Sequence, residues 1–182
     1  ASGGAELILT TPYDGADLFE LQFVQSGNEL TIVHRSYPPK VLKRIISGGV
    51  TSFTISDKPT SPTTQAPTGV TSTNIATSTE LNSGQFVKYI VTAAATSTYE
   101  ESLPSTSVSA KLTTGASPNT VSWNAVTGAA EYYVYKSRSK ADVFGFIGVS
   151  TGTSFIDDNI SPDYTDTPPI AVTMFSAGNY PG

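Results

Sequence analysis

Short runs of alternating apolar and polar residues, separated by turn-forming residues, fill the first third of the chain. In the run ELTIVHR, Leu30, Ile32 and His34 share one face of an extended strand, and the residues between them share the other. Similar runs flank it, namely LQFVQS, KVLKRIIS and TSFTIS, and the breaks between the runs contain GN, SYPP and GGV. This pattern predicts an antiparallel β-meander over residues 1–56.

The alternation stops over residues 57–68. The segment 56–68 reads SDKPTSPTTQAPT, which contains three prolines and several Thr and Ser residues but no apolar cluster. Such a composition is typical of an extended linker or a surface crossing. We therefore expect this segment to separate the meander from a second domain.

A second set of apolar–polar runs fills residues 69–168. Seven short β-like runs with turn residues between them predict a β-sandwich, so the fold class expected for the whole chain is all-β. The strands are expected near residues 70–74, 86–96, 105–112, 119–123, 131–136, 144–149 and 154–157.

The most specific stretch of this second domain is VSWNAVTGAAEYYVYKS. A tryptophan ends one strand, a turn follows, and aromatic residues then occupy both faces of the next strand. We expect four aromatic residues in the structural core: Tyr89, Trp123, Tyr133 and Tyr135. The other register of the strand would bury Tyr132 and Val134 instead.

Composition supports the β assignment and excludes several kinds of site. Only 14% of the residues are charged, and abundant Thr, Val, Tyr and Gly favour strands over helices. A net charge of −5 argues against a surface that wraps DNA, which needs clustered Lys and Arg. The lack of cysteine excludes disulfides and thiolate metal sites. No apolar run approaches the ~20 residues of a membrane span, so no membrane span is expected.

The sequence SWNAVTGAAEYYVYK resembles the fibronectin type III family, in which a tryptophan late in the second strand packs with a tyrosine in the third. The stretch KYIVTAAATSTYEESLPSTSVSAKL resembles later strands of that family, yet here it precedes the tryptophan. The resemblance implies a circularly permuted, fibronectin III-like sandwich over residues 69–168. The alternative is two incomplete domains in tandem. A structure with residues 86–112 outside the sheets that carry Trp123 would exclude the permutation.

The stretch TPYDGADLFELQFVQSGNELTIVHRSYPPKVLKR resembles phage tail nozzle (tail tubular) proteins, in which such a segment forms one blade of a β-propeller. VFGFIGVSTGTSFIDDNISPDYTDTPP and GNYPG resemble the passage back into the propeller and the start of its next blade. The resemblance implies that residues 1–56 form a propeller-blade-like meander and that residues 169–182 return toward the next blade. It also implies that the chain is a piece of a larger protein.

These resemblances imply a structural, non-enzymatic component of the phage tail, located in the virion and forming part of the DNA conduit. The implied partners are further copies in a homo-oligomeric ring, other phage tail proteins and the host surface, contacted by an outward sandwich. No sequence-specific nucleic acid is implied. The main alternative is a cell-surface or glycan-binding adhesion module that uses Tyr99, Tyr164 and Tyr180, and a third is an accessory domain of a polysaccharide hydrolase.

Candidate catalytic residues are few. His34 is the only histidine, which excludes a multi-histidine zinc site, and no G-x-S-x-G motif accompanies it. We interpret His34 as a strand residue beside a turn, hydrogen-bonded to the backbone. Glu100 and Glu101 could act as the carboxylate pair of a glycoside hydrolase, but adjacent residues of a strand point to opposite faces. No catalytic site is therefore expected.

One acidic segment, DDNISPDYTD, carries enough oxygen ligands for calcium. The candidate ligands are Asp157, Asp158, Asn159 and Asp163. The spacing of an EF-hand loop is absent, and Asp and Asn also stabilise turns by bonding to nearby backbone N–H groups. The sequence leaves calcium and the turn role open, and no other metal and no cofactor is expected.

Overall fold

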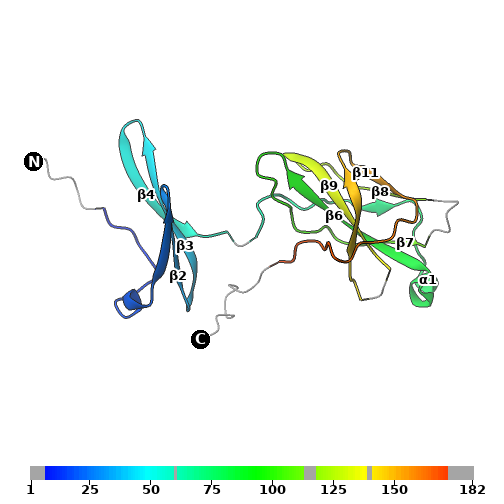
Figure 1. Ribbon diagram of the computed structural model, residues 1–182, viewed down its shortest axis with the longest axis horizontal. Coiled ribbons are helices and arrows are strands. Elements are labelled where there is room, and N and C mark those ends of the chain that lie inside the picture. Colours follow the sequence, from blue (N-terminus) through cyan, green and yellow to red (C-terminus); the bar gives the residue numbers. More distant parts are fainter. Residues whose placement is uncertain (1–6, 60, 113–117, 139–140, 172–182) are drawn as a thin grey trace, which may run out of the picture. The chain divides into compact units, whose positions relative to one another are not determined.

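The computed structural model describes residues 7–59, 61–112, 118–138 and 141–171, which belong to two compact units divided near residue 60. Almost all of the regular structure is antiparallel β-sheet (Figure 1), which confirms the predicted fold class. Most of the return segment predicted at residues 169–182 lies outside the described residues.

The first unit is a four-stranded meander. Its strands are β1 (Gln22–Ser26), β2 (Glu29–His34), β3 (Tyr37–Ser47) and β4 (Val50–Asp57), paired in sequential order. A short 3₁₀ helix, η1 (Asp17–Phe19), precedes β1. The turn between β3 and β4 uses Gly48 and Gly49, both with positive φ, as a tight hairpin turn requires. The strand–turn–strand order agrees with the predicted meander.

The second unit is a sandwich of two sheets with strand orders β10-β9-β6-β7 and β11-β8-β5. Each strand overlaps one of the seven predicted runs. The strands are β5 (Thr71–Ser72), β6 (Phe86–Ala95), β7 (Val108–Lys111), β8 (Asn119–Ser122), β9 (Ala129–Ser137), β10 (Gly145–Ser150) and β11 (Ser154–Asp157).

The described residues contain one α-helix, α1 (Ser78–Ser83), which the sequence analysis did not predict. A capping box begins it: the Thr77 hydroxyl accepts from the Glu80 backbone N–H, and the Glu80 carboxylate accepts from the Thr77 N–H. Gly84 ends it in the left-handed conformation. Both signals are present in the sequence TSTELNSG.

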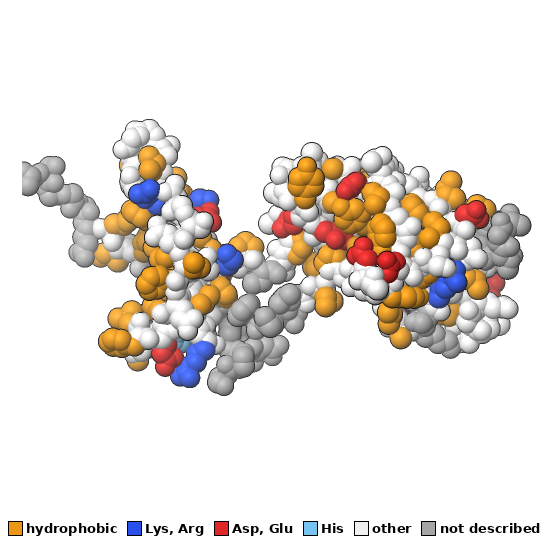
Figure 2. Space-filling model, viewed as in Figure 1, with side chains coloured by type: hydrophobic (Ala, Val, Ile, Leu, Met, Phe, Trp, Pro, Cys, Tyr) orange, Lys and Arg blue, Asp and Glu red, His pale blue; other side chains and the backbone are white. Residues whose placement is uncertain are grey.

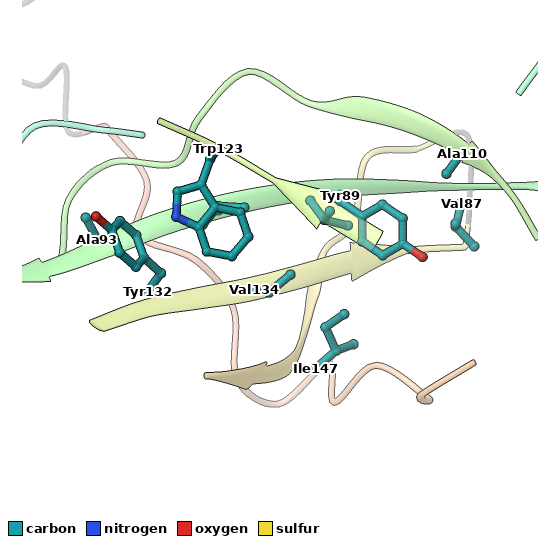
Figure 3. Close-up of a cluster of buried hydrophobic side chains, with 10 residues drawn as sticks. Val87, Tyr89, Ala93, Ala110, Trp123, Tyr132, Val134 and Ile147 are labelled. Carbon is teal, nitrogen blue, oxygen red and sulfur yellow. The ribbon is translucent and has the colours of Figure 1, made fainter. Parts of the chain in front are cut away.

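Residues 86–112 belong to the same sandwich as Trp123. Strand β6 pairs with β9, and β7 pairs with β6. Val87 and Tyr89 from β6 share one buried cluster with Val121 of β8 and with Trp123, which directly follows β8 (Figure 3). Residues 86–112 therefore do not lie outside the sheets around Trp123, so the structure does not exclude a permuted sandwich. The alternative of two incomplete domains is wrong.

The core between the sheets differs in part from the predicted set. Tyr89 and Trp123 belong to it as expected, and Trp123 packs against Tyr132 with ring centroids 5.3 Å apart (Figure 3). Strand β9 has the alternative register, so that Tyr132 and Val134 face the core. Tyr135 is buried on the opposite face of β9, and Tyr133 is only half-buried there, both against the ring of Phe146. Tyr135 is thus buried as expected, although it lies outside the cluster between the sheets, whereas Tyr133 is not fully buried.

Candidate functional site: the uncovered faces of the meander

The strand register of the meander collects apolar side chains on one face of the sheet. Phe23 lies opposite Ile32, and Leu30 lies opposite Leu42, which in turn lies opposite Ile55. Cross-strand partners point to the same side of a sheet. We call the surface that results the apolar face; its members are Phe23, Leu30, Ile32, Leu42, Phe53 and Ile55.

The other side of the sheet, called here the mixed face, also carries aliphatic side chains. Val24 and Val41 lie on either side of Thr31, and Ile45 lies opposite Ser52. Polar residues lie between them, including the ion pair of Lys43 with Glu29, whose Nζ and Oε1 are 2.7 Å apart. Both faces of the meander therefore offer aliphatic surface.

No described strand or helix of the first unit forms a layer over either face. Within β1–β4 every residue is half-buried or exposed except His34, and Phe23 is 72% exposed. A sheet is stable only when an apolar face is packed against another layer. Exposed apolar surface of this kind is typical of protein–protein contact sites.

His34 anchors a loop to the end of the meander. Its side chain is 2% exposed, its Nδ1 accepts a hydrogen bond from the Ser36 backbone N–H at 3.1 Å, and the Tyr37 ring lies 5.1 Å from its own. Its Nε2 lies 3.4 Å from a carboxylate oxygen of Glu20 and 3.7 Å from one of Asp17. These contacts agree with the interpretation of His34 as a turn residue bonded to the backbone.

The carboxylates beside His34 are held by other groups. Arg35 pairs with Glu20, with Nε and Oε2 2.9 Å apart. A hydrogen bond from the Asp14 backbone N–H, aided by one from Tyr37 and by the nearby His34, holds the pKa of Asp17 below its usual range. The arrangement fixes η1 to the sheet.

Glu100 and Glu101 have separate sets of hydrogen-bond partners. The Glu100 carboxylate accepts hydrogen bonds from the backbone N–H and the hydroxyl of both Thr63 and Thr64, at 2.7–3.0 Å. The Glu101 carboxylate instead accepts from the hydroxyls of Thr92 and Tyr135, at 2.6 and 2.7 Å. The two carboxylates therefore bind different partners, and Glu100 lies in a loop rather than in a strand.

The Glu100 contacts predict an acid-dependent loosening of residues 63–64. Hydrogen bonds from Thr63 and Thr64 hold the pKa of Glu100 below its ordinary value of 4.5. A carboxyl group whose pKa is lower in the folded than in the unfolded chain stabilises the fold at pH values above its unfolded-state pKa. This contribution is lost as the pH falls through the folded-state pKa. We expect the NMR amide signals of Thr63 and Thr64 to titrate with a midpoint below 4.5, and Glu100→Gln to remove that titration. A midpoint at or above 4.5 would contradict the contact.

Asp157 lies in a buried polar cluster that joins the two sheets. Its Oδ2 accepts hydrogen bonds from Lys136 Nζ at 2.7 Å and from the Tyr89 hydroxyl at 2.5 Å. Asn119 Nδ2 donates to the Tyr89 hydroxyl at 2.9 Å. Burial lowers the pKa of Lys136, and burial together with the hydrogen bond to Asp157 raises the pKa of Tyr89. We call Tyr89, Asn119, Lys136 and Asp157 the polar cluster.

The four calcium candidates are not brought together. The Asp157 carboxylate forms an ion pair with Lys136, and Asn159 Oδ1 accepts a hydrogen bond from the Arg138 guanidinium at 2.7 Å. Asp163 Oδ1 accepts from the backbone N–H and the hydroxyl of Thr165, which is the turn role. Asp158 is exposed. Among the described residues, no group of three or more acidic or histidine side chains could hold a metal ion.

Sequence reasoning missed the polar cluster altogether. Its members come from segments that are far apart in the sequence, and the pairing of Lys136 with Asp157 across 21 positions has no local signal. Of the exposed tyrosines proposed for glycan contact, Tyr99 is 84% and Tyr164 46% exposed, and Tyr180 lies outside the described residues.

No described helix is long and apolar enough to cross a membrane. Comparisons of the chain with protein-family models, with curated proteins and with solved structures found no match.

Proposed function

We propose that this chain is a structural part of a phage tail, in which the meander is one blade of a larger β-assembly. The uncovered apolar and mixed faces of the meander are the observation that carries the proposal. A blade buries both of its faces against neighbouring blades, so repeated sheets supply the missing layers. The resemblance of residues 11–44 to nozzle proteins supports the same role.

The candidate chemistry is also better explained by structure than by catalysis. His34 of β2 contacts the turn residue Ser36, Glu100 joins its loop to the loop of Thr63, and Glu101 accepts from Thr92 of β6. A net charge of −5 suits a DNA conduit, because like charges limit adhesion of the passing DNA. In this proposal the sandwich, which has its own closed core, is a contact domain attached to the blade.

The test is to locate the protein on intact phage particles. An antiserum raised against the whole chain, followed by gold-labelled second antibody, is applied to purified particles that carry the gene and viewed by negative-stain electron microscopy. We expect gold on the tails and none with preimmune serum. Gold on the surface of the cells and none on the tails would contradict a tail role and favour an adhesion module.

A further inference from the structure

A lysine and an aspartate lie side by side in the interior of the sandwich. Lys136 Nζ is 2.7 Å from Asp157 Oδ2, and both side chains are 1% exposed. Among the described residues of the sandwich they are the only buried charged side chains, whereas Figure 2 shows other acidic and basic side chains at its surface. Lys136 belongs to β9 and Asp157 ends β11, so the pair connects the two sheets.

Hydrogen bonds to both of its oxygens hold the Asp157 carboxylate in one orientation. Oδ1 accepts from the Ile160 backbone N–H at 2.8 Å, and Oδ2 accepts from the Tyr89 hydroxyl as well as from Lys136. Burial and the bond to Asp157 raise the pKa of Tyr89, so its hydroxyl stays protonated and donates. Donors directed at carboxyl oxygens stabilise the negative charge that develops on them when a nucleophile attacks the carbon. The arrangement therefore favours attack on Cγ of Asp157.

The Lys136 amine lies in a site that disfavours its charged form. Burial lowers the pKa of Lys136, although the contact with Asp157 opposes this effect. The share of neutral amine is therefore larger than at the protein surface, and a neutral amine is a nucleophile. Because Cγ is bonded directly to Oδ2, the hydrogen bond holds the amine beside the carbon that it would attack, and such proximity lowers the barrier to reaction.

An amide in place of the ion pair would remove two buried charges. The desolvation of such charges can exceed their mutual attraction, so a neutral replacement is favourable. The cluster also contains an acceptor for the amide N–H. Asn119 is the cross-strand partner of Asp157, and its Oδ1 is buried without a hydrogen-bond partner among the described residues. A buried polar atom of this kind is normally satisfied.

We propose that Lys136 and Asp157 join through an isopeptide bond that cross-links the two sheets. A proton passes from Nζ to the carboxylate, the Nζ lone pair attacks Cγ, and the bond from Cγ to the protonated oxygen then breaks. The leaving hydroxyl takes a second proton from Nζ and departs as water, so no oxidant or other reactant is required. The ion pair described above is the state before the bond forms. The proposal goes beyond the tail role and does not depend on it, since it concerns only the sandwich.

The test is mass spectrometry of the full 182-residue chain after incubation at neutral pH. We expect the intact mass to lie about 18 Da, one water molecule, below the mass of the sequence. Trypsin does not cleave after an acylated lysine, so digestion should release residues 112–138 joined to residues 141–182. Fragment ions of this species should locate the bond at Lys136 and Asp157.

Two variants control the measurement. Lys136→Arg keeps the positive charge, but its guanidinium stays protonated and does not attack, so this variant should keep the full mass. Lys88→Arg changes a lysine whose partner, Asp142, is exposed, and it should become linked like the unmodified chain. The linked peptides of the unmodified chain are read directly, so the result does not depend on the folding of either variant.

Four results would overturn the proposal. The first is the full mass with no linked peptides in the unmodified chain. The second is a loss of about 18 Da without linked peptides, which indicates dehydration at a single aspartate. The third is linkage of the same two peptides in Lys136→Arg. The fourth is a loss of about 17 Da, one ammonia molecule, with a bond inside residues 112–138, because it would assign the acceptor to Asn119 instead of Asp157.

Discussion

Replacing Asp157 with alanine is expected to lower the free energy of unfolding of the sandwich by about 3–5 kcal/mol, the usual cost of leaving one charge of a buried pair without its partner. The Lys136 and Asp157 side chains are each 1% exposed, and no second acidic group among the described residues pairs with Lys136. The variant also removes the acceptor of the Tyr89 hydroxyl. Urea unfolding followed by the fluorescence of Trp123, the one tryptophan of the chain, measures the loss.

Two variants control this measurement. Asp158→Ala removes the neighbouring exposed carboxylate and should change the unfolding free energy by no more than about 0.5 kcal/mol. Adding Lys136→Met to Asp157→Ala removes the unpaired charge and should recover part of the loss. A loss below about 1 kcal/mol in Asp157→Ala would show that the polar cluster does not hold the sheets together.

The meander is expected to be the weak part of the isolated chain. Its backbone amides in β1–β4 should exchange with deuterium at least about 100-fold faster than the amides of β6 and β9, because local opening free energies follow buried apolar contacts. Val87, Val91 and Ala93 of β6 are almost fully buried, whereas Phe23 and Ile46 of the meander are 72% and 58% exposed. Hydrogen exchange followed by mass spectrometry of peptic fragments measures both regions in one sample. Equal protection of the two regions would contradict this expectation.

The strands could be predicted because their signals are local. Alternation with period two, interrupted by Gly, Pro and Asn, located the four strands of the meander and the seven of the sandwich. The capping box of α1 was equally local, so the helix could have been found from Thr77, Glu80 and Gly84.

The register of β9 could not be chosen by alternation, since both faces of EYYVYK carry apolar residues. A lysine is expected outside, and placing Lys136 outside turns Tyr133 and Tyr135 inward, which is the wrong register. The structure buries Lys136 because Asp157, 21 positions away, supplies the opposite charge. Such a pairing has no local signal.

The same reason limits what could be predicted of the site. The interpretation of His34 as a turn residue needed only its neighbours, and the Ser36 contact is local. The contact of His34 with Glu20 joins two segments whose proximity the alternation of apolar and polar residues does not indicate. The same holds for the contact of Glu100 with Thr63. The exposure of the apolar face could not be read from alternation, because alternation indicates which residues share a face but not whether another layer covers it.

If neighbouring sheets complete the meander, they should slow hydrogen exchange in β2 and β3. The amides are measured in the 182-residue chain and in the protein translated from the whole reading frame that contains it. We expect protection of β2 and β3 to rise at least about 100-fold in the longer protein, while that of β6 and β9 stays the same. Unchanged exchange of β2 and β3 in the two proteins would contradict it.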